Sequence, residues 1–356
     1  MTAYFVLLAV GSFIISAVAN KFLLTFLNKR GVFDIPNARS SHVRPTPRGG
    51  GLGIIAGTVA CSAIYSAITG ETKIFILVFI GLIIGMVGWV DDIKKGLHVG
   101  LRFGIQFICS ALVIWIFNPI DILPFPAPFQ IHLHFFGFII SIIWLIGITN
   151  IFNFLDGIDG YAGVQGFIAG LMLAILAWGT PISFIGLFIA FSCAGFLIFN
   201  WHPAKIFMGD VGSSFLGFLF AALPFYLKDT QANGIRTEMF FATAIIIWFF
   251  LLDGTFTIFR RLFKGEKIWQ AHRSHLYQRL VITGMSHSEV VITVCFFYAI
   301  LFAVTIFYTL QPGGNLIRWP VLATGFILFF VYLIYTMVRE NRAEKVISRP
   351  EEKNNL

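Results

Sequence analysis

Five aspartates stand in three short polar stretches of an otherwise apolar chain, at spacings that suit metal and phosphate chemistry. Asp91 and Asp92 are adjacent, Asp156 and Asp159 are three residues apart, and Asp210 follows a Met-Gly pair. Crowded carboxylates repel one another unless a cation or a shared proton lies between them. Carboxylate oxygens are also the ligands that Mg²⁺ takes beside phosphate groups. Together the three stretches predict a metal-assisted site for diphosphate chemistry.

The adjacent pair Asp91 and Asp92 follows an apolar segment and precedes two lysines. On a helix, neighbouring side chains point about 100° apart, so the two carboxylates cannot serve one partner equally. We expect one to reach a metal ion or a proton while the other orients lysines or substrate. An ordinary solvated helix end is the alternative, although acid groups at a helix C-terminus oppose the helix dipole.

Asp156 and Asp159 would share one face of a helical turn, because residues three apart are neighbours on a helix. Asn150 and Asn153 precede them on a similar face and would add neutral polar ligands. The glycine that follows each aspartate allows a backbone or a phosphate to approach closely. The alternative is a plain glycine turn with incidental acids.

Asp210 would lie near the start of a helix, where Gly212, Ser213 and Ser214 leave backbone N–H groups for an anion. A carboxylate for Mg²⁺ beside such amides suits pyrophosphate chemistry. A simple helix N-cap is the alternative for Asp210. Phe207, just before it, would stack on a nucleobase or anchor in the membrane interface.

Two basic loops are candidates for contact with phosphate or sugar. The segment 260–279 carries His272, Arg273 and His275 among several basic residues. Positive charge that orients a membrane protein or meets anionic lipid would also explain this segment. Its His-x-x-His spacing would bind zinc only with a third ligand, and none stands nearby in the sequence. The segment 37–51 combines arginines with a glycine run that could cradle phosphates, but a basic linker explains it equally well.

The composition places these polar stretches in a membrane protein. Of the 356 residues, 58% are hydrophobic and 12% are charged, which a soluble domain of this size would not tolerate. Apolar runs long enough to cross a bilayer recur along the chain. We expect eleven spans, at 4–27, 52–69, 74–90, 100–117, 136–152, 161–178, 182–199, 213–227, 239–258, 288–309 and 319–338. The predicted fold is therefore an all-α polytopic integral membrane protein, with the first span retained rather than cleaved.

The distribution of positive charge sets the orientation of these spans. Most of the 25 lysines and arginines fall in the loops after odd-numbered spans and in the C-terminal tail. By the positive-inside rule these segments face the cytoplasm and the N-terminus faces out. The net charge of +8 thus reflects topology rather than nucleic-acid binding. All the acid clusters then lie on the cytoplasmic face, within one transmembrane catalytic domain (1–338) followed by a cytoplasmic polar tail (339–356).

Four motifs occur in order at alternate loops: Pro45–Gly51, Asp91–Lys95, Asn150–Gly160 and Phe207–Ser213. The ordered set resembles the polyprenyl-phosphate N-acetylhexosamine-1-phosphate transferases, a bacterial membrane family. The family includes the lipid I synthase of peptidoglycan and the initiating transferases of O-antigen and enterobacterial common antigen. The resemblance implies a bundle of ten or eleven helices with a cytoplasmic active site, in the bacterial inner (plasma) membrane.

The resemblance also implies an activity and its partners. A sugar 1-phosphate would pass from a UDP-sugar to undecaprenyl phosphate, releasing UMP, with Mg²⁺ or, in its place, Mn²⁺. The partners are thus undecaprenyl phosphate, a UDP-sugar and the lipid bilayer, with no nucleic acid, and a homodimer is compatible with this scheme. The proton- or ion-coupled transporter and the intramembrane prenyltransferase are the alternatives, since both also use membrane carboxylates.

Residue roles follow from the matched motifs. Asp210 would be the principal Mg²⁺ ligand, Asp91 a candidate base for the lipid phosphate, and Asp92 a support for the same site. Lys95 would bind phosphate. Asn153 would bind the nucleotide and the diphosphate together with the catalytic aspartates Asp156 and Asp159. Asn200 and Phe207 would contact the uridine.

The last basic loop departs from the histidine-rich patterns of the lipid I synthases and the common-antigen enzymes. The segment 271–279 reads AHRSHLYQR. It looks like the branch that starts O-antigen chains with 6-deoxy-N-acetylhexosamine sugars. We therefore expect His272, Arg273 and His275 to contact the sugar or the pyrophosphate.

Overall fold

The computed structural model describes residues 2–36, 41–94, 96–123, 125, 129, 131–227, 235–267, 272–310 and 318–348. Helices dominate this part of the chain, and the strands form two short antiparallel pairs, β1 with β2 and β3 with β4. In chain order the elements are α1 (Thr2–Arg30), β1 (Phe33–Asp34), β2 (Thr46–Pro47), α2 (Gly51–Thr69), α3 (Thr72–Lys94), α4 (Val99–Phe117), β3 (Ile122–Leu123), β4 (Ile131–His132), α5 (Phe136–Phe154), α6 (Tyr161–Leu176), α7 (Pro181–Asn200), α8 (Gly209–Ala222), the 3₁₀ turn η1 (Leu223–Tyr226), α9 (Ile235–Ile246), α10 (Trp248–Phe263), α11 (Leu276–Ile282), α12 (His287–Thr309) and α13 (Arg318–Ser348).

The helical elements confirm the all-α polytopic fold. Nine of the eleven expected spans each overlap one α-helix, the eighth overlaps α8 and η1, and the ninth overlaps the pair α9 and α10. Among the described residues, eight helices are long and apolar enough to cross a membrane, and a ninth span is counted if α9 and α10 are taken together. The helices α6 and α8 are shorter, and they pack tightly against α7 and α3, respectively.

The ninth span differs from the expected straight helix over 239–258, because α9 and α10 meet at an angle of 75°. Two side chains satisfy the backbone groups that the break releases. Gln165 Nε2 donates to the carbonyl of Ile246 (2.9 Å), and the amide of Phe249 donates to the hydroxyl of Tyr298 (3.3 Å). Such side-chain partners are needed wherever a helix breaks inside a membrane bundle. The apolar sequence runs through the break without a signal.

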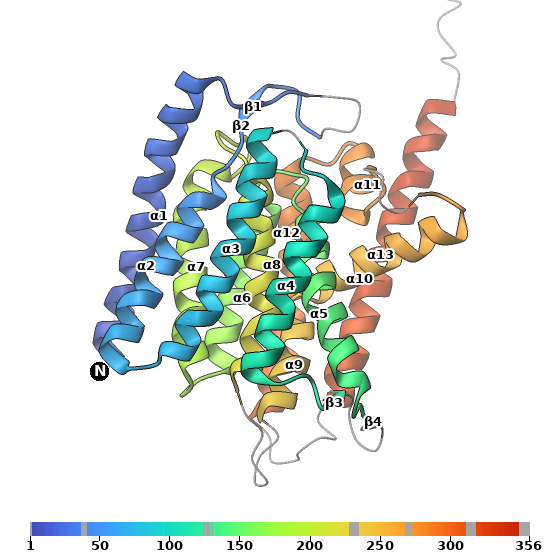
Figure 1. Ribbon diagram of the computed structural model, residues 1–356. Coiled ribbons are helices and arrows are strands. Elements are labelled where there is room, and N and C mark those ends of the chain that lie inside the picture. Colours follow the sequence, from blue (N-terminus) through green and yellow to red (C-terminus); the bar gives the residue numbers. More distant parts are fainter. Residues whose placement is uncertain are drawn as a thin grey trace, which may run out of the picture.

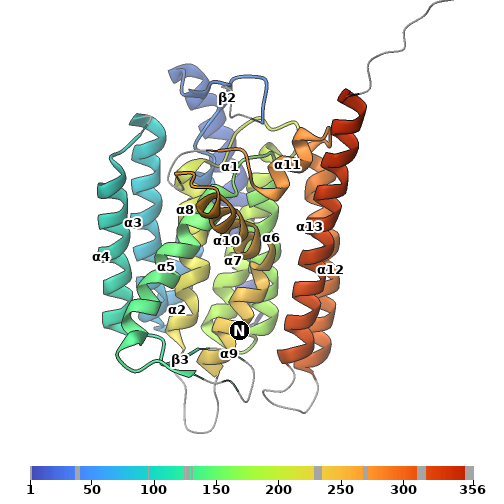
Figure 2. The ribbon, with the colours of Figure 1, turned by 90° about the vertical axis from the view of Figure 1, so that its right-hand side faces the viewer.

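The two ends of the bundle differ in what they carry. In Figure 1 the N-terminus of α1 lies toward the bottom of the bundle, at the same end as β3 and β4. The sheet β1–β2, helix α11 and the C-terminal end of α13 gather at the top, and Figure 2 shows the same separation after a 90° turn. The positive-charge distribution assigns this top end to the cytoplasm.

Helices α2, α3 and α8 touch backbone to backbone at the cytoplasmic end. A Cβ atom added to Gly88 of α3 would lie 2.4 Å from the carbonyl oxygen of Asp210, and one added to Gly51 of α2 would lie 2.2 Å from the Cα of Gly212. Contacts that close are sterically impossible for a larger residue. These glycines therefore bring the start of α8 against the end of α3, where Asp91 and Asp92 lie.

This packing predicts that Gly88→Ala destabilises the protein by about 1–3 kcal/mol, the usual cost of overpacking a tight core. Gly147→Ala in α5 is the matched control, because an added Cβ there meets nothing within 4 Å. Thermal unfolding of the two variants in detergent would compare them. Equal stability of the two variants would contradict the close approach of α3 and α8.

Candidate active site

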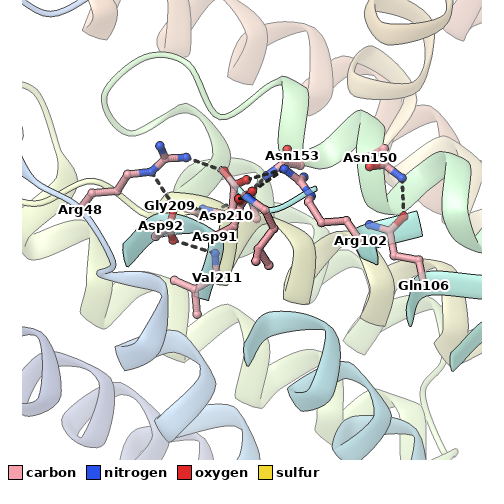
Figure 3. Close-up of polar contacts among 12 residues, drawn as sticks. Arg48, Asp91, Asp92, Arg102, Gln106, Asn150, Asn153, Gly209, Asp210 and Val211 are labelled. Atoms are coloured by element: carbon pink, nitrogen blue, oxygen red, sulfur yellow. Dashed lines mark hydrogen bonds and ion pairs between the residues drawn. The ribbon is translucent and has the colours of Figure 1, made fainter. Parts of the chain in front are cut away.

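Asp92 on α3 caps the N-terminus of α8. Its two carboxylate oxygens accept hydrogen bonds from the amides of Asp210 and Val211, both at 3.1 Å, and Oδ1 lies 2.8 Å from Arg48 Nε (Figure 3). The N-cap residue of α8, Met208, makes no side-chain cap of its own. Gly209 has a φ of 78°, and a Cβ there would lie 2.5 Å from Asp92 Oδ2. Asp92 thus positions the helix start that carries Asp210.

Two arginines bind the carboxylates of Asp91 and Asp210. Arg48 Nη2 pairs with Asp210 Oδ1, while Arg102 Nη1 lies 2.5 Å from Asp91 Oδ2 and 3.2 Å from Asp210 Oδ2 (Figure 3). The amide of Leu97 donates to the other oxygen of Asp91. The adjacent Asp91 and Asp92 therefore have different partners, as their angular separation on a helix requires.

Arg102 is a member of this cluster that the sequence analysis missed. It lies one turn inside α4, within a predicted membrane span, and belongs to none of the motifs that we identified. A charged residue within a predicted span is a functional signal that could have identified it. The two guanidinium groups supply planar, bidentate donors of the kind that bind phosphate.

Backbone hydrogen bonds between two distant segments place Arg48. The amide of Phe207 donates to the carbonyl of Pro47 (2.8 Å), and the amides of Gly49 and Gly50 donate to the carbonyl of Phe207 (3.1 and 2.8 Å). The first cytoplasmic loop is thereby joined to the segment that precedes α8. The Pro-Thr-Pro-Arg-Gly-Gly-Gly motif acts here as the framework that directs Arg48 toward Asp92 and Asp210.

The two asparagines before the Asp156 turn separate in space. Asn153 Nδ2 donates to Ser213 Oγ (2.9 Å), and the Asn153 side chain also hydrogen-bonds Asp210. Asn150 Nδ2 instead donates to Gln106 Oε1 and to the carbonyl of Ile146, both at 2.8 Å. Asn153 therefore belongs to the carboxylate cluster, while Asn150 joins α4 to α5.

A cavity of about 360 Å³ adjoins the cluster at the cytoplasmic end. Five of the predicted site residues line it, namely Asp156, Asp159, Asn200, Phe207 and His272. Arg48 and Gly209 form the side shared with the carboxylate cluster, while Ser41, His42, Gln278 and His287 line other parts of it. The His42 ring packs at 4.8 Å from the ring of Phe207, centroid to centroid, with an interplanar angle of 63°.

Asp156 lies between the cavity and the carboxylate cluster. Burial raises the pKa of its carboxyl to about 7, and the negative charges of Asp210 and Asp92 add to this rise. Arg48 and the amide of Gly209 act in the opposite direction without cancelling it. Among the described residues of this cluster, the guanidinium groups of Arg48 and Arg102 are surrounded by four carboxylates, those of Asp91, Asp92, Asp156 and Asp210. Full ionisation leaves a formal charge of −2, which one divalent cation would balance.

The donor set of this cluster fits magnesium. Carboxylate oxygens and the amide oxygen of an asparagine are the hard ligands that Mg²⁺ takes, and it keeps several waters for contact with phosphates. Asp210, with Asp91 and Asn153 beside it, supplies such a set. The negative charges of Asp210 and Asp92 add to the effect of burial in raising the pKa of Asp156, which is consistent with a position that suits a cation.

Asp159 forms a second polar centre with two histidines. Its Oδ2 lies 2.6 Å from His202 Nδ1 and 3.3 Å from His287 Nδ1, and it accepts the amide of Ala204 at 3.1 Å. Burial acts to raise the pKa of Asp159, but hydrogen bonds from His287 and His202 outweigh it and lower that pKa. The three side chains lie close enough to hold a metal ion, but nitrogen-rich sites suit zinc-like metals rather than Mg²⁺.

His202 and His287 were missed by the sequence analysis because they lie far apart in the chain and in no common motif. His287 is the first residue of α12, and its Nε2 lies 3.2 Å from the carbonyl oxygen of Ser41. Its Nδ1 lies 3.2 Å from the amide nitrogen of Asp159. His287 therefore connects α12, the first cytoplasmic loop and the Asp159 turn.

Asn200 joins two loops at the base of the cavity. Its Oδ1 accepts the amide of Gly160 (3.0 Å) and its Nδ2 donates to the carbonyl of Ile206 (2.9 Å). The side chain is thus committed to holding the turn after Asp159 against the segment before Phe207. Any contact with a ligand would come in addition to this structural role.

The last basic loop divides between cavity and core. His272 lines the cavity, and burial, with nearby positive charge, lowers its pKa to about 4, so its ring is neutral at physiological pH. His275 is 2% exposed and lies 3.2 Å, through Nδ1, from Asp253. Neither His275 nor Arg273 borders the cavity. Lys95 lies outside the described residues.

Comparison with known proteins relates this geometry to a family. The sequence model of glycosyl transferase family 4 matches residues 74–228, a range that contains all three acid stretches. A probable undecaprenyl-phosphate N-acetylglucosaminyl 1-phosphate transferase of Bacillus subtilis is 30% identical over 327 residues, covering 88% of this chain and 85% of its own. The chain belongs to the polyprenyl-phosphate N-acetylhexosamine-1-phosphate transferase family.

Other relatives support the same membership. A decaprenyl-phosphate N-acetylglucosaminephosphotransferase of Mycobacterium leprae is 27% identical and covers 88% of this chain and 86% of its own. A phospho-N-acetylmuramoyl-pentapeptide-transferase of Staphylococcus saprophyticus is 29% identical and covers 70% and 82%, respectively. The protein is thus a multi-pass bacterial membrane transferase of sugar 1-phosphate to polyprenyl phosphate, which decides against the transporter and the prenyltransferase.

Because the pKa of Asp156 is raised, we expect the Asp156→Asn variant to become more stable relative to wild type as pH rises. Because the folded-state pKa, about 7, exceeds the ordinary value, the folded protein binds this proton more tightly, and its stability falls as pH rises toward 7. The asparagine cannot ionise, so its advantage over wild type should grow by about 2 kcal/mol between pH 5 and pH 8. Unfolding in detergent without divalent metal measures this. A pH-independent difference would contradict the assignment, and Asp121→Asn is the exposed control.

Proposed function

We propose that this transferase moves an N-acetylhexosamine 1-phosphate, or its 6-deoxy form, from a UDP-sugar to undecaprenyl phosphate and releases UMP. The reaction would use Mg²⁺, or Mn²⁺ in its place, at the cytoplasmic face of the inner (plasma) membrane. It would be the first membrane step of O-antigen or related cell-envelope polysaccharide synthesis. The observation that carries the proposal is the cluster of Asp91, Asp92, Asp156 and Asp210, which bears excess negative charge beside a polar cavity at one end of a membrane bundle.

The reaction joins two anions, so charge neutralisation is its main requirement. An oxygen of the lipid phosphate attacks the phosphorus that carries the sugar, and the bond from that phosphorus to the oxygen of UMP breaks. A divalent cation held by Asp210 would supply the charge that stabilises the diphosphate. Arg48 and Arg102 stand where they can donate to phosphate oxygens, and Lys95 would add to them. Asp91 would keep the lipid phosphate free of its proton.

The cavity provides a place for the nucleotide sugar. Phe207 would stack on the uracil ring, with His42 holding its edge. Asn200, together with Asn153, Asp156 and Asp159, would hold the uridine and the diphosphate. His272, which lines the cavity, would contact the sugar, and Arg273 follows it on the same loop. The buried His275 would act indirectly, by holding this loop against Asp253. A homodimer is compatible with these roles because each chain contains all the residues to which a role is assigned.

Asp210→Asn tests the proposed activity. It should abolish Mg²⁺-dependent UMP release while the protein stays inserted and folded, because the metal loses its principal anionic ligand. UMP release is measured in detergent with undecaprenyl phosphate and a panel of UDP-sugars. Asp121→Asn, which is exposed in the outer loop, should keep wild-type rates. Wild-type rates in Asp210→Asn would remove Asp210 from the metal site, and no UMP release by the wild type with any UDP-sugar would sink the proposal.

Sugar selectivity is expected to depend on the last basic loop. A 6-deoxy sugar differs from N-acetylglucosamine chiefly by one hydroxyl, and an apolar pocket separates such pairs by only roughly 10²-fold. Greater selectivity requires a polar contact, for which Arg273 is the candidate. Competition between UDP-N-acetylglucosamine and UDP-N-acetylquinovosamine, its 6-deoxy counterpart, should show a changed preference after Arg273→Ala. An unchanged preference with weaker diphosphate binding would assign this loop to phosphate instead.

A further inference from the structure

A fully buried carboxylate on α10 takes no part in the proposed chemistry. Asp253 is 0% exposed and does not border the cavity. Burying an ionised group in a membrane bundle is costly unless several donors surround it. Asp253 has four such donors, namely the amide of Leu276 at 3.0 Å, the amide of Tyr277 at 3.4 Å, His275 Nδ1 at 3.2 Å and Thr257 Oγ1 at 3.1 Å.

Three of these donors come from the start of α11. Leu276 and Tyr277 are its first two residues and His275 is its N-cap, so Asp253 caps this short helix from another element. Arg260, on the same face of α10, donates through Nη2 to the carbonyl of Ser274 at 2.6 Å. One face of α10 therefore fixes the backbone from 274 to 277. Figure 1 and Figure 2 both show α10 leaving the direction of the bundle at the end where α11 lies.

The segment fixed by Asp253 reaches the cavity on two sides. On one side, the His272 ring lies 4.9 Å from the His275 ring, centroid to centroid, and Gln278, whose Oε1 accepts the His275 amide at 3.4 Å, lines the cavity. On the other side, the Tyr277 hydroxyl donates to the carbonyl of Phe154 at 3.3 Å. A Cβ added to Gly157 would lie 2.2 Å from that hydroxyl oxygen, so Tyr277 closes against the turn of Asp156.

We propose that Asp253 is a positioning residue that, through the start of α11, sets where His272, Gln278 and the Asp156–Gly157 turn stand around the nucleotide-sugar cavity. The inference rests on the proposed function, because that function assigns the cavity to the UDP-sugar. Asp253 touches no reacting atom and acts through its neighbours. An asparagine at this position would turn an N–H₂ group toward one of the backbone amides and leave that donor without an acceptor.

The proposal predicts a local structural change together with a selective loss of nucleotide binding. In Asp253→Asn, the amides of 274–280 should exchange with deuterium at least about tenfold faster, because their cap is weakened. The Kd for UMP and the KM for the UDP-sugar should each rise about tenfold, while the KM for undecaprenyl phosphate stays within about twofold of wild type. If Asp253 had a merely structural role, the variant would yield less folded protein, but the Kd for UMP and the KM for the UDP-sugar would equal those of wild type.

A second variant covers the case in which Asp253→Asn fails to fold. Thr257→Val keeps the side-chain shape, removes one donor from the carboxylate, and should move the same exchange rates and constants in the same direction by about two- to fivefold. Thr305→Val is the matched control, because among the described residues that buried threonine hydroxyl donates only to the carbonyl of Leu301 in its own helix. Thr305→Val should leave every constant unchanged.

The outcomes separate this inference from the proposed function. Faster exchange at 274–280 with unchanged UMP and UDP-sugar constants would overturn the positioning role and leave the proposed function intact. Unchanged exchange in both Asp253→Asn and Thr257→Val would also overturn it. A wild-type protein that neither binds UMP nor releases it from any UDP-sugar would sink the proposed function itself, whatever the exchange rates.

Discussion

Neutralisation of crowded carboxylates is the constraint on which the rest of this structure depends. Asp91, Asp92, Asp156 and Asp210 come from three segments and meet at one end of a bundle whose described helices expose many large hydrophobic side chains. Their mutual repulsion is opposed by the guanidinium groups of Arg48 and Arg102 and by the amides at the start of α8. By accepting those amides, Asp92 stabilises the start of α8 at this point.

The same constraint explains why separate loops are joined so firmly. Arg48 can pair with Asp92 and Asp210 only if its loop is fixed against α8. Backbone hydrogen bonds to Phe207 and the close approach of Gly51 to Gly212 fix this loop. The polar end of the bundle is therefore one connected network. A change in one loop should be transmitted to the cluster through the backbone as well as through charge.

The sequence was sufficient for the bundle and for most of the carboxylates, because these are encoded locally. Apolar runs of membrane length mark the spans, and acid residues between them mark the polar end. Asp210 was open to interpretation as a simple helix cap. In the structure Asp92 caps α8, and the side chain of Asp210 instead pairs with two arginines.

Apart from Arg102, the features that the sequence did not predict depend on contacts between distant segments. The break between α9 and α10 has no local signal, since its freed backbone groups are satisfied by Gln165 of α6 and Tyr298 of α12. His202 and His287 meet Asp159 only after α7 and α12 have packed. The burial of His275 likewise follows from Asp253, a residue that looks like an isolated charge when the sequence is taken alone.

Because two cations oppose four carboxylates, the cluster is stable enough to fold yet retains an affinity for further positive charge. A perfectly neutral set of ion pairs would resist both a metal ion and a phosphate, since each new partner would have to displace an equal one. Here a divalent cation can join without expelling an arginine, and phosphate oxygens can then take over the guanidinium donors that the carboxylates now occupy. Burial is the main cause of the raised pKa of Asp156, and the negative charges of Asp210 and Asp92 add to it. The excess charge that weakens the fold is thus the same charge that prepares the site to bind.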